Sequence, residues 1–292
     1  GPNSFWLDGS AAVEPNSRFT IMGDCSGPLA EYVTYRVAER RVDIHRADGS
    51  LVSEESTFFD YLDRQLKERA TPPRHDLPFA FSLGYVGYLG YELKADVGGQ
   101  LVHTAATPDA SMVFADRALV FDHESGTCYV MALVVDHADP VTAAWFDTVV
   151  DSLEAMRDGV QAPPPQERPL LAPYFEADLP LRHEREKYLG LIEQCLAEIR
   201  SGETYEVCLT NTATFPGSID AFSTYSTLRE INPTPYSAYL GFTDLSICSA
   251  SPERFLRIDA DRVVESKPIK GTRPRGATAE EDAKLRADLV GN

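Results

Sequence analysis

The sequence has few cysteines, and none of them has the spacing of a metal or redox site. Five cysteines are scattered over 292 residues, with no C-x-x-C pair and no nearby paired histidines at zinc-site spacing. A zinc site of the usual kind is therefore excluded. Reduced and mostly buried thiols are expected at Cys25, Cys128, Cys195, Cys208 and Cys248.

Long hydrophobic runs are also absent. No segment approaches the roughly 20 consecutive apolar residues that a membrane-spanning helix needs. The N-terminus lacks the basic and then apolar layout of a secretion signal. The sequence therefore predicts a protein of the cytoplasm that has no membrane partner.

Basic residues are scarce relative to acidic ones. The chain has 27 Lys and Arg against 45 Asp and Glu, which gives a formal net charge of −18. The electrostatic field of this negative charge disfavours nucleic acid and anionic membranes as binding partners. It would also repel a dianionic substrate, so binding one requires local cations or a metal. The densest basic stretch in the second half is Lys267, Lys270, Arg273 and Arg275.

Hydrophobic periodicity predicts a mixture of helices and hairpins. Helical spacing covers residues 58–66, 141–156, 184–201 and, after a capping box of Thr278 with Glu281, about 278–289. Strand patterns joined by turn residues pair 114–121 with 127–135, 237–242 with 245–250, and 255–258 with 262–265. Residues 204–210 alternate between a more apolar and a more polar face, which also predicts a strand there. Glycines that stand beside tyrosines predict another strand over 84–93.

A proline-rich segment separates two parts of the chain. Residues 161–169 read QAPPPQERP, and consecutive prolines continue neither a helix nor a ladder. We therefore divide the chain into an N-terminal part, 1–160, a linker, 161–173, and a second part, 174–292. The 43% hydrophobic content is enough for a substantial core.

The segment PIKGTRPRG, residues 268–276, is the most informative stretch. Arg273 and Arg275 lie near Lys270, and like charge favours a free amine that can act as a nucleophile. Gly271 permits a substrate to approach the backbone closely. The alternative interpretation of this segment is a solvated basic loop.

Four ordered motifs resemble the family of chorismate-utilising enzymes. They are GETYEVCLT at 202–210, NPTPYSAYL at 232–240, SPERF at 251–255 and the PIKGT segment. Within this family, lysine in PIKGT resembles the aminodeoxychorismate synthase component I branch, whereas anthranilate synthases resemble PIAGT. The resemblance implies an α+β fold with antiparallel β-sheets packed face to face and helices outside, and it implies that the C-terminal part is missing here.

The resemblance implies roles for five residues. Lys270 would add to chorismate, and Glu253 would act near the leaving hydroxyl, although an ion pair of Glu253 with Arg254 or another arginine explains that residue equally well. Gly271 and Thr272 would contact substrate, or Thr272 would be a turn hydroxyl. Glu206 stands where related isochorismate synthases carry a lysine that activates water, which argues against water as the nucleophile.

Two further segments resemble the surroundings of a tryptophan pocket in relatives. They contain Ser10, Pro233 and Tyr236 as possible relics of that pocket. Gly9 stands where the family usually has serine, and the Asn-Pro-x-Pro run also fits a rigid turn between a helix and a strand.

The implied function is that of aminodeoxychorismate synthase component I, for 4-aminobenzoate and folate or for secondary metabolism. Ammonia would come from a glutamine amidotransferase partner or fused domain. Mg²⁺ would be the cofactor, with ligands beyond the point that corresponds to Asn292, so no metal ligand is assigned within the chain and the chain alone is expected to be inactive. The alternatives are an anthranilate synthase component I-like enzyme and a noncatalytic fragment that binds chorismate or an amidotransferase.

Overall fold

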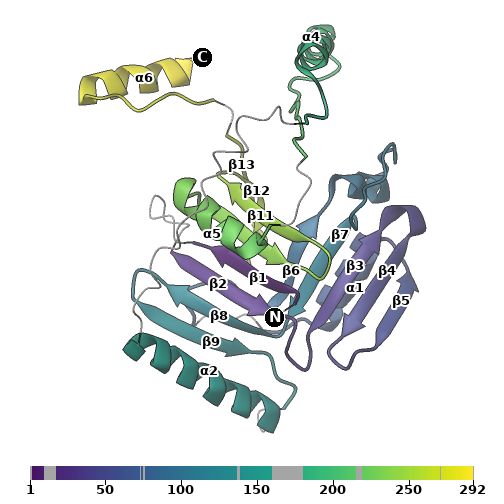
Figure 1. The fold of residues 1–292 in the computed structure, drawn as a ribbon, viewed down its shortest axis with the longest axis vertical. Coiled ribbons are helices and arrows are strands. Elements are labelled where there is room, and N and C mark those ends of the chain that lie inside the picture. The colour runs from purple at the N-terminus through teal and green to yellow at the C-terminus, as the bar shows by residue number, and fades with distance from the viewer. Residues whose placement is uncertain are drawn as a thin grey trace. The chain divides into compact units, whose positions relative to one another are not determined.

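The structure, a computed structural model, describes residues 2–9, 18–72, 74, 76–136, 139–159, 180–214, 219–269 and 271–291. It contains two compact units, Gly1–Asp151 with Ala221–Asn292, and Ser152–Asp220. The strands of its three sheets belong to the first unit (Figure 1). The predicted linker, 161–173, lies outside the described residues, and the division into 1–160 and 174–292 stays a prediction.

A six-stranded antiparallel sheet brings together strands that are distant in sequence. Its order is β11-β10-β1-β2-β8-β9. Within it, Phe5 lies opposite Gly23 on one side and Leu240 on the other. The strands are β1 (Ser4–Asp8), β2 (Phe19–Asp24), β8 (Arg117–Asp122), β9 (Thr127–Ala132), β10 (Tyr236–Gly241) and β11 (Ser246–Ser251).

A second sheet has five antiparallel strands in the order β5-β4-β3-β7-β6. They are β3 (Glu31–Arg36), β4 (Arg41–Arg46), β5 (Leu51–Glu55), β6 (Gly84–Leu89) and β7 (Ala110–Ala115). A short helix η2 (Val37–Glu39) connects β3 to β4. The predicted strand with glycines and tyrosines is confirmed over β6. A Cβ on Gly87 would lie 2.0 Å from the Ser111 carbonyl oxygen, so only glycine fits beside β7.

The chain passes from one sheet to the other at Asp116. We predicted a single strand over 114–121, but β7 ends before this residue and β8 begins after it. The Asp116 side chain is fully buried and accepts a hydrogen bond from the Leu29 amide at 2.8 Å. Burial raises the pKa of this carboxyl. The start of the predicted strand was wrong because the run is apolar on both sides of the change of sheet. The predicted hairpin is confirmed, since β8 pairs with β9.

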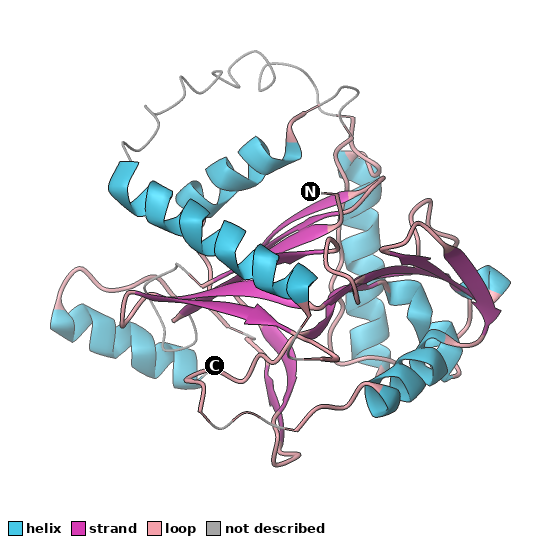
Figure 2. Ribbon diagram, turned by 90° about the horizontal axis from the view of Figure 1, so that it is seen from below, coloured by secondary structure: helices cyan, strands magenta, loops and turns pink. Residues whose placement is uncertain are grey.

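The two sheets pack face to face. Phe5 and Leu240 from the six-stranded sheet share one buried cluster with Tyr32, Val86 and Val113 from the five-stranded sheet. These side chains alternate with outward-facing residues along each strand. Figure 2 colours the strands magenta and shows the two sheets meeting. The predicted α+β fold with antiparallel sheets packed face to face is confirmed.

Helices cover the outer faces of the sheets. Helix α1 (Phe58–Glu68) places Phe58 and Tyr61 against Tyr35 of β3, where Leu93 from η3 (Tyr91–Val97) completes a second buried cluster. Helix α5 (Ala221–Ile231) packs Tyr225 edge-on against Trp6, with ring centroids 5.3 Å apart. None of the helices in the described part of the chain combines the length and apolar character that a bilayer span requires.

Helix α2 (Pro140–Gly159) begins in the first unit. Its Trp145 ring lies under the Arg117 guanidinium, whose Cζ is 4.9 Å from the ring centroid. The predicted helix over 141–156 is confirmed. This cation–π contact attaches the helix to the start of β8.

A hairpin and a terminal helix follow the six-stranded sheet. The hairpin pairs β12 (Arg254–Ile258) with β13 (Val264–Lys267), and α6 is Ala279–Gly291. The hairpin exposes apolar side chains, and Phe255 retains 85% of its accessible surface. The predicted hairpin and final helix are confirmed to within a few residues.

The second unit contains α4 (Arg185–Ser201), which confirms the predicted helix. It ends at Gly202, whose φ of +82° and amide bonds to the Glu198 and Ile199 carbonyls form a helix C-cap. The strand predicted over 204–210 is wrong, because no described segment pairs with it. Alternation alone does not supply the partner strand that a ladder requires.

Candidate active site

The candidate site is built around residues 251–278, because Lys270 itself lies outside the described residues. The flanking Ile269 and Gly271 are exposed. A Cβ on Gly271 would lie 3.0 Å from Leu289 Cδ1, so α6 limits the space at this glycine. The role of Lys270 as a nucleophile therefore stays a prediction.

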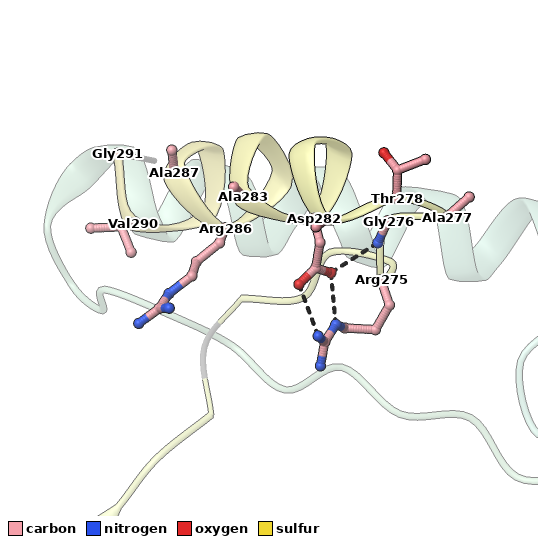
Figure 3. A pocket seen from close by; sticks show the side chains of 11 residues that line it. Arg275, Gly276, Ala277, Thr278, Asp282, Ala283, Arg286, Ala287, Val290 and Gly291 are labelled. Atoms are coloured by element: carbon pink, nitrogen blue, oxygen red, sulfur yellow. Dashed lines mark hydrogen bonds and ion pairs between the residues drawn. The ribbon is translucent and has the colours of Figure 1, made fainter.

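Carboxylates of α6 hold the arginines of this segment. Arg275 donates from Nε and Nη2 to Asp282 at 2.7 and 2.8 Å, and the Gly276 amide donates to the same carboxylate at 2.9 Å (Figure 3). Arg273 Nε donates to Asp288 at 2.5 Å. The Arg275 hydrogen bonds lower the pKa of Asp282.

The start of α6 is capped by its own side chains. Thr278 Oγ1 accepts from the Glu281 amide at 3.2 Å. The Glu281 carboxylate in turn accepts from the Ala277 amide at 2.9 Å. The predicted capping pair is confirmed, although the reciprocal bond goes to the residue before Thr278. These bonds fix how the segment enters the helix.

The basic stretch is not left as unopposed positive charge. Lys267 lies 3.1 Å from Glu265, which also pairs with Arg254. The Lys267 hydrogen bond lowers the pKa of Glu265. Together with the arginine pairs to α6, this means that local carboxylates compensate the cations described here. A dianion would have to compete with these partners.

Glu253 is exposed and lies in a tight turn before β12. Its amide donates to Ser251 Oγ at 3.3 Å, and its carbonyl accepts from the same hydroxyl at 3.1 Å. The alternative of an ion pair with Arg254 is not observed in the described structure, because Arg254 binds Glu265 instead. The role of Glu253 as an acid stays a prediction.

The two remaining predicted substrate contacts lie in different units. Thr272 is exposed, and its carbonyl accepts from Arg273 Nη1 at 3.0 Å. Glu206 lies in the second unit, is exposed, and accepts at its carbonyl from Thr204 Oγ1 at 2.7 Å. The structure therefore groups Glu253, Gly271 and Thr272 in one unit and describes Glu206 separately.

Strand pairing brings together the two segments that resemble a tryptophan pocket, because Asp8 of β1 lies opposite Ser237 of β10. This buried carboxylate accepts from Arg229 Nε at 2.5 Å and from the Tyr225 hydroxyl at 3.4 Å. Thr20 Oγ1 bonds to Asp8 at 3.4 Å and to His123 Nε2 at 2.8 Å. Burial is the main cause of the raised pKa of Tyr225. Sequence reasoning did not find this network, although an acidic residue in an apolar strand is a signal for one.

Of the three predicted relics of the pocket, Ser10 lies outside the described residues. Pro233 is exposed and Tyr236 is partly buried at the start of β10. The segment between α5 and β10 is closed by a 2.7 Å hydrogen bond between the Thr234 and Ser237 hydroxyls. This geometry fits the rigid helix-to-strand turn, and a tryptophan-binding role stays a prediction.

Clusters suited to a metal ion are absent from the described ranges. No group of three or more His, Cys, Asp or Glu side chains gathers there. The carboxylates of α6 that lie near the candidate site are engaged by arginines. The described residues therefore do not fit a Mg²⁺ site.

Comparison with known proteins assigns the class. Residues 8–292 match the family described as chorismate binding enzyme, and the chain belongs to this family. Two relatives named aminodeoxychorismate synthase, from Streptomyces pristinaespiralis and Streptomyces griseus, are 45% and 46% identical over 99% and 98% of this chain. The chain covers 40% and 39% of their lengths. It thus spans about two fifths of these curated relatives.

Relatives from the other branch are also similar. Anthranilate synthase component 1 from Thermus thermophilus is 35% identical over 99% of this chain and 58% of its own length. The crystal structure of anthranilate synthase component I from Streptococcus pneumoniae TIGR4 superposes with a TM-score of 0.67 at 21% identity. That superposition covers 94% of this chain and 57% of the other, and it shows the fold alone.

Proposed function

We propose that the protein is the chorismate-converting component of an aminodeoxychorismate synthase, which replaces the 4-hydroxyl of chorismate by an amino group. The observation that carries the proposal is lysine at position 270 within the PIKGT motif. The two Streptomyces relatives, whose names state this activity, support it. The product would serve 4-aminobenzoate and folate synthesis or a secondary metabolite.

The reaction would proceed through an enzyme-bound intermediate. The Lys270 amine adds to C2 of chorismate, the ring double bonds shift, and the C4 hydroxyl leaves. Ammonia then adds to C4, the double bonds shift back, and the C2–nitrogen bond to Lys270 breaks. The lysine is regenerated, and the net change is exchange of hydroxyl for amine at C4. Nucleophilic catalysis divides one difficult displacement into two easier steps.

Proton transfer accompanies each step. The leaving hydroxyl departs as water when it receives a proton, and Glu253 is the proposed donor. The proton that Lys270 loses on bonding to C2 is restored when ammonia, which loses one, displaces it. Because Glu253 is exposed in this structure, its role as an acid requires that bound substrate or other residues shield it from water.

The cofactor and partner belong to the same proposal. Mg²⁺ is proposed as the cofactor, held by residues other than those described, which gather no suitable cluster. A glutamine amidotransferase, separate or fused, would supply ammonia in the cytoplasm. The chain would bind neither nucleic acid nor membrane, which its net charge of −18 supports.

The lack of a metal cluster in the described ranges favours one alternative, a noncatalytic fragment that binds chorismate or the amidotransferase. Calorimetric titration with chorismate and Mg²⁺, run beside a turnover assay, separates the two proposals. Heat of binding without product supports the fragment. Product formation by this chain rules it out.

Product analysis tests whether the protein is an aminodeoxychorismate synthase or an anthranilate synthase. The 292-residue chain and a form extended beyond Asn292 would be incubated with chorismate, ammonium and Mg²⁺, and the products identified by mass and ultraviolet spectrum. We expect 4-amino-4-deoxychorismate from the extended form. Anthranilate as the product would overturn the assignment and place the protein in the other branch.

A further inference from the structure

A cavity of about 510 Å³ lies on the outer face of the six-stranded sheet. Residues of β1, β2, β8 and β10 form its floor, and residues of α2 and α5 contribute to its walls. None of the described residues of the lysine segment, residues 268–276, lines it. Five aromatic residues line the cavity, namely Phe5, Trp6, Trp145, Phe222 and Tyr239.

The strand register explains how these side chains gather. Trp6 pairs with Tyr239 on one side and with Met22 on the other, and Met22 pairs with Leu119. These residues form one row across the outer face of the sheet. Arg117 precedes Leu119 by two residues, so its side chain leaves the strand on the same face.

Two residues of the lining each carry a hydrogen-bond donor that has no partner among the described residues. Trp6 Nε1 and Arg117 Nη2 are buried, and neither bonds to any residue in the described part of the chain. Arg117 is only 7% exposed. The positive charge of its guanidinium favours lower pKa values at Asp116 and Asp139, but neither carboxylate accepts a hydrogen bond from it. The guanidinium also stacks on the Trp145 ring. Buried donors of this kind are rare in folded proteins, and a ligand oxygen would satisfy both.

A carboxylate in the lining restricts the charge that a bound ligand can carry. Asp24 also lines the cavity, and its Oδ1 accepts from the Ser26 amide at 2.9 Å and the Ser26 hydroxyl at 2.5 Å. One guanidinium beside one carboxylate favours a monoanion over a dianion. Aromatic walls favour a flat ring, since aromatic pairs gain from stacked and edge-on contacts.

The geometry points to a binding site for a small aromatic monocarboxylate, distinct from the lysine segment. Its oxygens accept hydrogen bonds from Arg117 Nη2 and Trp6 Nε1, and its ring packs against the aromatic walls. The site does not depend on the proposed reaction, because it shares no residue with the candidate active site.

The chain itself provides the probe for this site. Its sequence contains two tryptophans, Trp6 and Trp145, and both line the cavity. Benzoate titrated into the full chain is expected to change tryptophan emission saturably and to release heat in calorimetry. Benzamide keeps the ring without the charge, cyclohexanecarboxylate keeps the charge without the aromatic ring, and isophthalate is a dianion. Each is expected to bind about tenfold more weakly or worse.

Matched variants test the two donors by calorimetry. Arg117→Gln is expected to raise the benzoate Kd about tenfold or more, whereas Arg69→Gln leaves it unchanged. Arg69 is the appropriate control, because it also stacks on an aromatic ring, at 4.2 Å from the Phe114 centroid, but it is the C-cap of α1 and its ring partner lies in the other sheet. Trp6→Phe removes a buried unpartnered donor and is expected to weaken binding more than Trp145→Phe.

Circular dichroism and melting curves establish that each variant is folded. If Arg117→Gln does not fold, Arg117→Lys replaces it, since lysine keeps the charge but lacks the planar fork and is expected to weaken binding severalfold. Absence of emission change and heat with millimolar benzoate would overturn the proposal. Equal affinity in wild-type protein and in both the Arg117 and Trp6 variants would overturn it as well.

Discussion

The position of Gly9 allows a sharp test of the structure. This buried residue follows β1, and its amide donates to Thr20 Oγ1 at 3.2 Å. A Cβ at Gly9 would lie 2.0 Å from the Phe19 carbonyl oxygen and 2.7 Å from its carbonyl carbon. Ordinary contact begins near 3.4 Å, so the backbone of β2 must move by more than an ångström.

We therefore expect Gly9→Ala to lower the free energy of unfolding by about 3 kcal/mol, the upper part of the usual range for overpacking. The obstacle is backbone rather than a flexible side chain, and the displaced strand carries Thr20, which bonds both Asp8 and His123. For a chain of this size, the melting temperature would fall by roughly 6–12 °C. Gly9→Ser, which restores the residue usual in the family, is expected to be at least as damaging.

Urea unfolding followed by circular dichroism measures the change. Gly190→Ala is the control, because Gly190 lies inside α4 with nothing within 4 Å of its added Cβ. That substitution is expected to be neutral or to stabilise α4 by up to about 1 kcal/mol. A Gly9→Ala protein within about 0.5 kcal/mol of wild type would refute the close approach of β1 and β2 at this position.

Further predictions concern the candidate active site and Cys25. Lys270→Ala is expected to reduce product formation by orders of magnitude and Lys267→Ala much less; equal, small losses would make Lys270 a solvated charge. Without ammonia, mass spectrometry is expected to find a chorismate-derived adduct on the Lys270 peptide, absent in Lys270→Arg, and full activity of that variant would exclude the covalent route. Burial raises the pKa of the Cys25 thiol to about 11 from 9.0. Its neutral form therefore stabilises the fold below about pH 9, and this stability is lost as the pH rises through 11. In unfolding measurements, Cys25→Ala is expected to reduce this loss of stability at alkaline pH. Asp282→Asn is expected to leave the melting temperature nearly unchanged but to speed tryptic cleavage after Arg275, and unchanged cleavage would contradict the ion pair as the restraint on this segment.

The sequence alone determined where some helices begin or end, because capping residues are visible in it. The helix that ends at Gly202 and the cap at Thr278 depend on contacts within a few residues, which the sequence displays directly. The PIKGT motif identified the family for the same reason, because its spacing is local. Residue types and their spacing were therefore enough to locate the candidate site along the chain.

Contacts between distant segments were decided only by the tertiary structure. The change of sheet at Asp116 and the lack of a strand over 204–210 depend on which segments pair, and periodicity does not encode the partner. The sequence showed Arg275 as part of a positive cluster, whereas the folded chain places it on Asp282. The cavity under Trp145 and the buried donor on Arg117 likewise exist only because strands and helices from both ends of the chain meet, which is a property of packing rather than of sequence order.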